Sequence, residues 1–415
     1  MDITASQIES IVRSVINSMG NGACNNACAP SRVANGPIPT TAKVAMLTGP
    51  KKIEVQELPI PPLGDDDILV KVEGAGICGT DVHEWKMDPF GLIPVILGHE
   101  GTGEVVALGK NVKVDTAGKP LKVGDKIVTS VTNCGDCYTC RMHPETTNLC
   151  DNQGVFGLIG DKRGTAEGNR INGWFADYMV IKGGYGITYF EVNDLNLKQR
   201  MLLELACVCV HALERSQSTG LLNFGSKVLV QGCGPVGLVM ITVLRAAGIN
   251  HIIAVDGNED RLKVAERMGA KTTVCFRRPT EDTLDKRVAK IQSVANGVGV
   301  DFAFQCTGAP VAASDIFSYI RRGGGMCEMG FFVNNGEYQI NPHLAMCQKE
   351  INIVGSWDYS AQDYPKTMAF LKQCEEMRIP IEELITHSFP LDKMNEAMET
   401  NVAQAGIKIC YINND

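Results

Sequence analysis

The stretch Lys227-Val-Leu-Val-Gln-Gly-Cys-Gly-Pro-Val-Gly237 joins a short apolar run to three glycines in the pattern G-x-G-x-x-G. The apolar run predicts a buried strand, and the residues from the last glycine onward predict a helix. A second apolar run, His251–Asp256, ends in an acidic residue 19 positions beyond Gly237. A strand, glycine turn and helix followed at this distance by an acidic residue are typical of a dinucleotide-binding unit. The sequence therefore predicts a doubly wound, parallel α/β sheet of the Rossmann type.

Each glycine of this turn has its own steric task. Gly232 permits the tight turn, Gly234 lets the backbone approach a pyrophosphate, and Gly237 allows close packing of helix on strand. The carboxylate of Asp256 would accept hydrogen bonds from ribose hydroxyls and repel a 2′-phosphate, which favours NAD over NADP. The basic Arg261 follows five residues later and either reaches the cofactor or lies on an outer helix face. The predicted cofactor-binding residues of this segment are Gly232, Gly234, Pro235, Val236, Gly237, Asp256 and Arg261.

The same alternation of strand and helix continues toward the C-terminus, whereas the preceding part of the chain is rich in short β-like runs. In the earlier part the expected strands are Lys43–Leu47, Ile68–Val72, Gly103–Leu108 and Lys126–Ser130. In the later part they are Val228–Gln231, Ile252–Val255, Phe302–Phe304, Gly325–Met329, Ile351–Val354 and Ile407–Ile412. A helix is expected near Arg261–Met268.

Composition excludes several classes of protein. The chain has 415 residues, 39 basic and 47 acidic side chains, and a net charge of −8. This mild acidity argues against binding to nucleic acid or to an acidic membrane surface. No apolar run reaches the roughly 18 residues needed to cross a bilayer, and the first 20 residues lack a secretory signal. We expect a cytoplasmic chain of two or three domains.

The N-terminus carries a helical apolar stripe. Within residues 3–19 the stripe consists of Ile8, Ile11, Val12, Val15, Ile16 and Met19. Residues 21–41 are rich in Gly, Asn, Ala, Ser and Pro and predict a flexible linker. A helix this short needs a partner surface. It resembles the encapsulation peptides that direct enzymes into bacterial microcompartments by docking on shell or cargo proteins; docking on its own body or in an oligomer contact are the alternatives.

Sixteen cysteines in a chain without an export signal indicate metal binding and core packing rather than disulfides. Four of them form the pattern C-x2-C-x2-C-x9-C, a spacing that suits a closed, tetrahedral, structural zinc site. Redox-active thiols are the alternative. These four residues are Cys134, Cys137, Cys140 and Cys150.

A second set of metal-binding side chains is dispersed along the chain. It comprises Cys78, Thr80 and His83 in one segment, the pair His99-Glu100, and a third segment with Glu204, Cys207, Cys209 and His211. A thiolate, an imidazole and a carboxylate are the ligands of catalytic zinc sites, which keep one position open for substrate. Such a zinc would polarise a carbonyl or lower the pKa of an alcohol. The hydroxyl and imidazole near the thiolate could carry the released proton outward.

The combination resembles the zinc-dependent medium-chain dehydrogenases, the superfamily of alcohol, sorbitol, butanediol and threonine dehydrogenases. The resemblance rests on G-I-C-G-T-D-x-H at 76–83, G-H-E at 98–100, the four-cysteine lobe, G-C-G-P-V-G, and Cys306-Thr-Gly at a later strand end. It implies a GroES-like catalytic domain over residues 42–204, a Rossmann domain over 205–355 and a return to the catalytic domain over 356–415. Residues 1–20 would precede these as the helix and 21–41 as its linker.

The resemblance also implies residue roles. Cys78 and His99 would bind the catalytic zinc, with Glu100 as an occasional ligand. Glu204 would be a third ligand or hold a water on the zinc, and Thr80 and His83 would form the proton relay. Cys306 and Thr307 would contact the cofactor. A homodimer or homotetramer is the usual assembly of this branch.

The leading hypothesis is therefore an NAD(H)-dependent enzyme with two Zn²⁺ per chain that interconverts a small alcohol or polyol with its aldehyde or ketone. It would act in the cytoplasm or in the lumen of a microcompartment. The rival hypotheses are a threonine-type amino-alcohol dehydrogenase, a catalytically silent NAD-binding scaffold, and an interaction module that presents the N-terminal helix.

Overall fold

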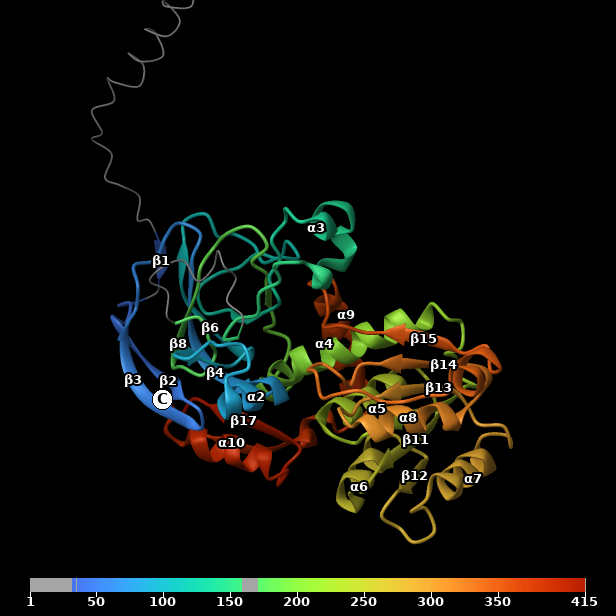
Figure 1. Ribbon diagram of the computed structural model, residues 1–415. Helices are drawn as coiled ribbons and strands as arrows, with labels where there is room; N and C mark the ends of the chain where they lie inside the picture. Colours follow the sequence, from blue (N-terminus) through green and yellow to red (C-terminus); the bar gives the residue numbers. More distant parts are fainter. Residues whose placement is uncertain (1–31, 35, 159–170, 415) are drawn as a thin grey trace, which may run out of the picture.

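The computed structural model describes residues 32–34, 36–158 and 171–414 (Figure 1). The predicted N-terminal helix and the first part of its linker lie outside these residues. Docking of residues 3–19 on a microcompartment protein therefore stays a prediction.

A six-stranded parallel sheet forms the half of the molecule that contains the glycine turn. Its spatial order is β12-β11-β10-β13-β14-β15, so the strands run 3-2-1-4-5-6 in chain order. This is the doubly wound order of dinucleotide-binding domains, which confirms the predicted fold class. The strands are β10 (Lys227–Gln231), β11 (His251–Asp256), β12 (Thr272–Cys275), β13 (Val300–Gln305), β14 (Ile320–Glu328) and β15 (Asn352–Gly355). The helices between them are α5 (Pro235–Ala246), α6 (Glu259–Met268), α7 (Leu284–Val294) and α8 (Pro310–Tyr319), with the short turn η2 (His343–Cys347) before β15.

The central strand of this sheet is the apolar run that precedes the glycines. Val228, Leu229 and Val230 of β10 are all fully buried, because β11 and β13 flank the strand and helices cover both faces. A strand buried on both faces reads as a continuous apolar run rather than an alternating one. This is why the run could be recognised from sequence.

The other half is built from strands that pair antiparallel, except for the parallel pair β16 and β17. An eight-stranded sheet follows the path β16-β17-β4-β6-β7-β9, with β1 paired to β6 and β8 to β4, and a smaller sheet has the order β3-β2-β5. The strands are β1 (Arg32–Ala34), β2 (Thr41–Gly49), β3 (Lys52–Pro59), β4 (Ile68–Gly76), β5 (Val95–Ile96), β6 (Glu100–Gly109), β7 (Lys126–Thr129), β8 (Tyr178–Ile181), β9 (Tyr189–Glu191), β16 (Ile385–Phe389) and β17 (Lys408–Ile412). The short helices of this half are α2 (Gly79–Met87), α3 (Tyr138–Met142), α10 (Met394–Val402), η1 (Pro144–Leu149) and η4 (Leu391–Lys393). The short helix η3 (Ile381–Leu384) packs instead on α4 (Leu197–Gln217) and α5.

Residues 32–34 differ from the sequence expectation. They lie inside the predicted linker, yet they form β1, which pairs antiparallel with β6 from Arg32 opposite Gly109 to Ala34 opposite Ala107. The pairing is made by backbone groups, and composition alone does not reveal which residues of a small-residue segment meet a sheet edge.

The helix α4 (Leu197–Gln217) crosses the boundary predicted at residue 205. Near its start Met201 lies against Gly74 of β4, and further along the Cys209 thiol contacts the carbonyl of Val236 in α5 at 3.4 Å. Side chains of β7, α4, α5 and the parallel sheet share one continuous apolar cluster. Helix α4 therefore joins the two halves, and Figure 1 shows it running between them.

The C-terminal segment returns to the antiparallel half later in the chain than the predicted boundary at residue 356. Helix α9 (Asp363–Glu376) packs on α4 and α5, and only β16 and β17 join the antiparallel sheet. In Figure 1 the red C-terminal strand β17 accordingly lies beside the blue β4. Apolar periodicity marks α9 as a packed helix but does not say which domain it packs against.

The close approach of α5 to β10 depends on a missing side chain. A Cβ at Gly237 would lie 1.7 Å from the carbonyl oxygen of Gly232, whereas a Cβ at Gly234 would meet no atom within 4 Å. Gly232 itself has a φ of +95°, a conformation that favours glycine.

We predict that Gly237→Ala lowers the free energy of unfolding by about 1–3 kcal/mol or more, because overpacked helix–strand contacts must move apart. Gly234→Ala is the matched control: it should keep the stability but weaken NADH binding, since its methyl group would face the pyrophosphate. Denaturant unfolding and NADH fluorescence titration measure the two effects. Equal stability of the two variants would contradict the packing role of Gly237.

Candidate active site

The start of helix α2 fixes the first candidate zinc ligand. Cys78 is the N-cap residue, and its backbone N–H donates to Oδ2 of Asp81 at 2.8 Å, so the acidic residue of G-I-C-G-T-D closes a capping box. The local motif therefore places the sulfur of Cys78 at the start of the helix.

Three predicted ligands come together in the fold. One ligand atom each of Cys78, His99 and Glu100 lie within 4.8 Å of one another. His99 precedes β6, Glu100 is its first residue, and both side chains are buried. A thiolate, an imidazole and a carboxylate at this separation fit a zinc ion with one open position.

Asp81 holds two of these ligands at once. Its fully buried carboxylate accepts the Cys78 N–H through Oδ2, while Oδ1 accepts the Gly98 N–H at 3.3 Å and lies 3.4 Å from Nδ1 of His99. Burial disfavours a charged imidazole, but the charge of Asp81 outweighs it and raises the pKa of His99 well above its usual value. A carboxylate behind a histidine is the arrangement that orients the ring toward a metal.

Glu100 is also held by a buried cation. Lys408 of β17 is only 2% exposed; its Nζ forms an ion pair with Oε2 of Glu100 and donates to the carbonyl of Ile77 at 3.1 Å. Gly76 leaves the room for this pair, since a Cβ there would collide with both side chains. Because Lys408 occupies Oε2, the other oxygen of Glu100 is the one left for a metal.

Glu204 lies in the same cavity but outside the close set of three. It projects from α4 and forms a hydrogen bond with Tyr359. Burial, reinforced by the charge of Glu100, raises the pKa of Glu204 to about 8. Of the two candidate carboxylates, the fold brings Glu100 rather than Glu204 beside Cys78 and His99.

The cavity at these residues connects the metal ligands with the glycine turn. It has a volume of about 300 Å³, and Val236 and Cys306 line it together with the three close ligands and Glu204. A second cavity of about 450 Å³ continues it outward, and Thr80 and His83 line both. Thr80 Oγ1 lies 3.6 Å from the Cys78 sulfur. The predicted relay residues therefore stand between the ligands and the outer cavity.

Three of the remaining predicted cofactor residues line a separate cavity of about 340 Å³ at the ends of β10, β11 and β13. They are Gly232, Asp256 and Thr307, whereas Gly234, Pro235, Gly237 and Arg261 do not line it. The Asp256 carboxylate accepts the backbone N–H groups of Cys233 at 2.7 Å and Asn258 at 2.8 Å. It is thereby fixed at the place where the ribose of a dinucleotide is expected.

The four-cysteine lobe also assembles as the spacing predicts. The sulfurs of Cys134, Cys137, Cys140 and Cys150 lie within 4.8 Å of one another. Backbone N–H groups point at three of these sulfurs, with distances of 3.2–3.4 Å. Such a closed set of four leaves no position for substrate and suits a structural zinc. The fourteen cysteines in the described part of the chain are all free of disulfides.

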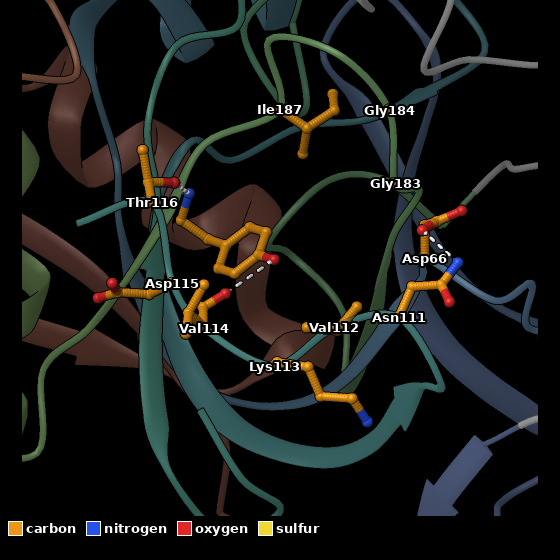
Figure 2. A pocket seen from close by; sticks show the side chains of 11 residues that line it. Asp66, Asn111, Val112, Lys113, Val114, Asp115, Thr116, Gly183, Gly184 and Ile187 are labelled. Atoms are coloured by element: carbon orange, nitrogen blue, oxygen red, sulfur yellow. Dashed lines mark hydrogen bonds between the residues drawn. The ribbon is translucent and has the colours of Figure 1, made fainter. Parts of the chain in front are cut away.

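A larger cavity lies elsewhere in the antiparallel half. It has a volume of about 600 Å³, and Figure 2 shows Asp66 and Asn111 on one side of it and Thr116 on the other. Asn111 donates to Asp66 at 2.9 Å, so these polar groups satisfy each other. None of the predicted site residues lines this cavity. The chemistry of the lining, and not its size, therefore identifies the candidate site.

Comparison with known proteins agrees with this geometry. Residues 64–188 match the alcohol dehydrogenase GroES-like domain and residues 235–373 the zinc-binding dehydrogenase domain. Sorbitol dehydrogenase of Bacillus subtilis (strain 168) is 30% identical over 368 residues, covering 87% of this chain and 94% of the relative. L-idonate 5-dehydrogenase of Vitis vinifera is 31% identical over 378 residues, covering 88% and 93%. The chain belongs to the zinc-dependent medium-chain dehydrogenases.

Solved structures of such dehydrogenases share the whole fold. An alcohol dehydrogenase of Thermotoga maritima has a TM-score of 0.82 at 28% identity, and 2R,3R-butanediol dehydrogenase of Bacillus subtilis has one of 0.73 at 27% identity. Each comparison covers 90% of this chain and 100% of the other. The protein is thus a zinc-dependent alcohol or polyol oxidoreductase whose cofactors are Zn²⁺ and NAD(H). None of the helices within the described ranges is both long and apolar enough to cross a membrane.

Sequence reasoning gave no role to three residues of the site. Asp81 is part of the quoted motif, and its position three residues after Cys78 is a helix-capping signal. Lys408 is the single charge in an apolar run, which hints at a buried partner. Asp358, which lines both connected cavities, follows β15 in a loop that offers no sequence signal.

We predict that Lys408→Met lowers the free energy of unfolding by roughly 3–5 kcal/mol, because Glu100 would be left as an uncompensated buried charge. The exposed Lys198 offers the control Lys198→Met, which should have little effect. Denaturant unfolding of both variants, with zinc content as a second readout, tests the pair. A Lys408 variant as stable as its control would show that Glu100 does not depend on this cation.

Proposed function

We propose that the protein transfers a hydride between NAD(H) and a small alcohol or polyol, or its aldehyde or ketone, at the cavity of about 300 Å³. One observation carries this proposal: the same cavity is lined by Cys78, His99 and Glu100 and by Val236 at the start of the cofactor-binding helix. A substrate in this cavity would therefore reach both the proposed metal ligands and the helix that would hold the cofactor.

Zinc bound there would act as a Lewis acid on the substrate oxygen, and the nicotinamide would accept or donate the hydride. Cys78, His99 and a carboxylate would hold the zinc, with Asp81 keeping the sulfur and the ring in place. Because Glu204 lies outside the close set of three, we assign Glu100 as the nearer carboxylate and Glu204 to a water at the open position.

The protein's own residues would then move the proton. Thr80 Oγ1, beside the Cys78 sulfur, is placed to accept the proton of the alcohol hydroxyl while passing its own proton on. His83 lies three residues further along α2, so its ring is on the same helix face and lines the outer cavity. The proton would leave through His83 to solvent, and the reverse path would supply it for carbonyl reduction.

We predict that Cys78→Ser lowers kcat by at least about 100-fold, because the zinc loses its thiolate ligand. NADH binding should stay within a few-fold, since the glycine turn is untouched. Turnover followed by NADH absorbance, NADH titration and zinc content measure these effects; Cys347→Ser, at an exposed cysteine, is the control. Unchanged turnover with full zinc content would refute the assignment of the catalytic zinc.

Intact Cys78, His99 and Glu100 argue against the rival hypothesis of a catalytically silent scaffold.

We further propose that Asp256 makes the enzyme prefer NAD over NADP. Asp256→Asn keeps an oxygen acceptor for the Cys233 N–H but removes the charge that would repel a 2′-phosphate. The ratio of kcat/KM for NAD to that for NADP should fall by about tenfold, whereas Asp285→Asn, on an exposed face of α7, should leave it unchanged. A ratio unaltered in Asp256→Asn would refute the role.

Delivery to a microcompartment is a separate proposal that rests on the apolar stripe within residues 3–19. A variant lacking residues 1–31 should retain turnover and lose co-localisation with shell proteins, because the stripe would act only as a docking surface. Co-localisation that persists in this variant would contradict the proposal.

A further inference from the structure

The loop after β15 carries Asp358 into the mouth of the proposed substrate cavity. Asp358 is 8% exposed and lines both the inner and the outer cavity. Its φ is +53°, a backbone conformation that costs energy in residues other than glycine. A strained residue of this kind persists only when its surroundings fix it, and such residues cluster at ligand-binding sites.

The surroundings that fix this loop belong to the four-cysteine lobe. Gln153 Nε2 donates to Oδ2 of Asp358 at 3.0 Å, and Asn148 Nδ2 donates to the carbonyl of Trp357 at 2.7 Å. Asn148 and Gln153 lie two residues before and three residues after Cys150, the last sulfur of the lobe. The lobe therefore holds the Trp357–Asp358 segment in place.

The basic groups near Asp358 are imidazoles. His83 and His99 line the cavities with it, and the charges of His99 and His211 act on it. Within the described ranges, no Lys or Arg lines either cavity. Burial raises the pKa of Asp358 to about 6, so the carboxylate is still charged at neutral pH. A buried carboxylate that faces a cavity and keeps its charge favours a hydrogen-bond donor as its ligand.

An aromatic wall flanks the carboxylate. The rings of Phe332 and Trp357 stack at a centroid distance of 4.7 Å and an angle of 11°, and both line the outer cavity. They remain 43% and 44% exposed. This wall covers the carbon skeleton of a ligand while the adjacent carboxylate takes its polar group.

We propose that Asp358 is a specificity-determining residue that accepts a hydrogen bond from a hydroxyl or amino group on the substrate carbon next to the reacting one. The preferred substrates are then vicinal diols, polyols or amino alcohols, and monofunctional alcohols are poorer. Substrates with a carboxylate or phosphate at this position are repelled. The inference rests on the proposed function, whose substrate class it narrows.

Three secondary alcohols with one carbon skeleton test the inference: 2-butanol, 2,3-butanediol and 3-amino-2-butanol. The zinc-loaded enzyme should oxidise the two donor-bearing alcohols with higher kcat/KM than 2-butanol. In Asp358→Asn this advantage in kcat/KM should fall by about tenfold or more, because that is the contribution of a hydrogen bond to a charged group. The kcat/KM for 2-butanol should change by less than about twofold. A greater loss for the amino alcohol assigns an ammonium group to this position, and a greater loss for the diol assigns a hydroxyl.

Two further variants keep the test specific. Asp392→Asn removes an exposed carboxylate that lines neither cavity and should leave the advantage unchanged. Gln153→Met removes the donor that holds Asp358 and should reduce the advantage in the same direction, with two zincs per chain and the unfolding midpoint retained. A reduction in Asp358→Asn without one in Gln153→Met would overturn the role of the lobe in positioning Asp358.

The failure of this inference and that of the proposed function are distinguishable. Turnover of all three alcohols with the same ratio in wild type and Asp358→Asn overturns the role of Asp358 and leaves the dehydrogenase activity intact. No turnover of any of the three by protein that holds two zincs per chain overturns the proposed function and the inference together.

Discussion

Helix α4 packs with its start on the antiparallel sheet and with its middle on α5, and the apolar cluster around it is continuous between the two halves. Close-packed interiors resist deformation, so this cluster fixes the distance between the zinc ligands and the glycine turn. Hydride transfer requires that distance to be held within a fraction of an ångström. The cavity that contains both sets of residues is therefore a consequence of how α4 is buried.

Two of the charges inside this frame are paired. Asp81 accepts two backbone N–H groups and faces His99, and Lys408 pairs with Glu100. An isolated buried charge would cost several kcal/mol, whereas a paired and hydrogen-bonded one is tolerated and fixes geometry. These pairs orient the ligands before any metal binds. At the cavity mouth, hydrogen bonds from the four-cysteine lobe likewise hold the loop of Trp357 and Asp358 in place.

Much of this arrangement could be predicted locally. The βαβ unit, the four-cysteine spacing and the G-I-C-G-T-D segment each specify their own geometry over a few residues, through turn sterics, metal-ligand spacing and helix capping. The strands found at Ile68–Gly76, Glu100–Gly109 and Val300–Gln305 contain the expected runs. The extent of α4, the strand at Arg32–Ala34 and the packing of α9 on the Rossmann side could not be read in this way, since each depends on a partner far away in sequence.

The fold class, the dinucleotide turn, the set of four close thiols and the candidate residues for a catalytic zinc could all be predicted from local sequence patterns. Which carboxylate lies beside Cys78 and His99 depends on the three-dimensional fold, because Glu100 and Glu204 are equivalent as chemical types and differ only in where β6 and α4 carry them. The fold also decided the roles of Lys408 and Asp358. Lys408 is 308 positions away from Glu100, and Asp358 is 205 positions away from Gln153. These pairs meet through sheet pairing and loop packing, which no local sequence pattern encodes.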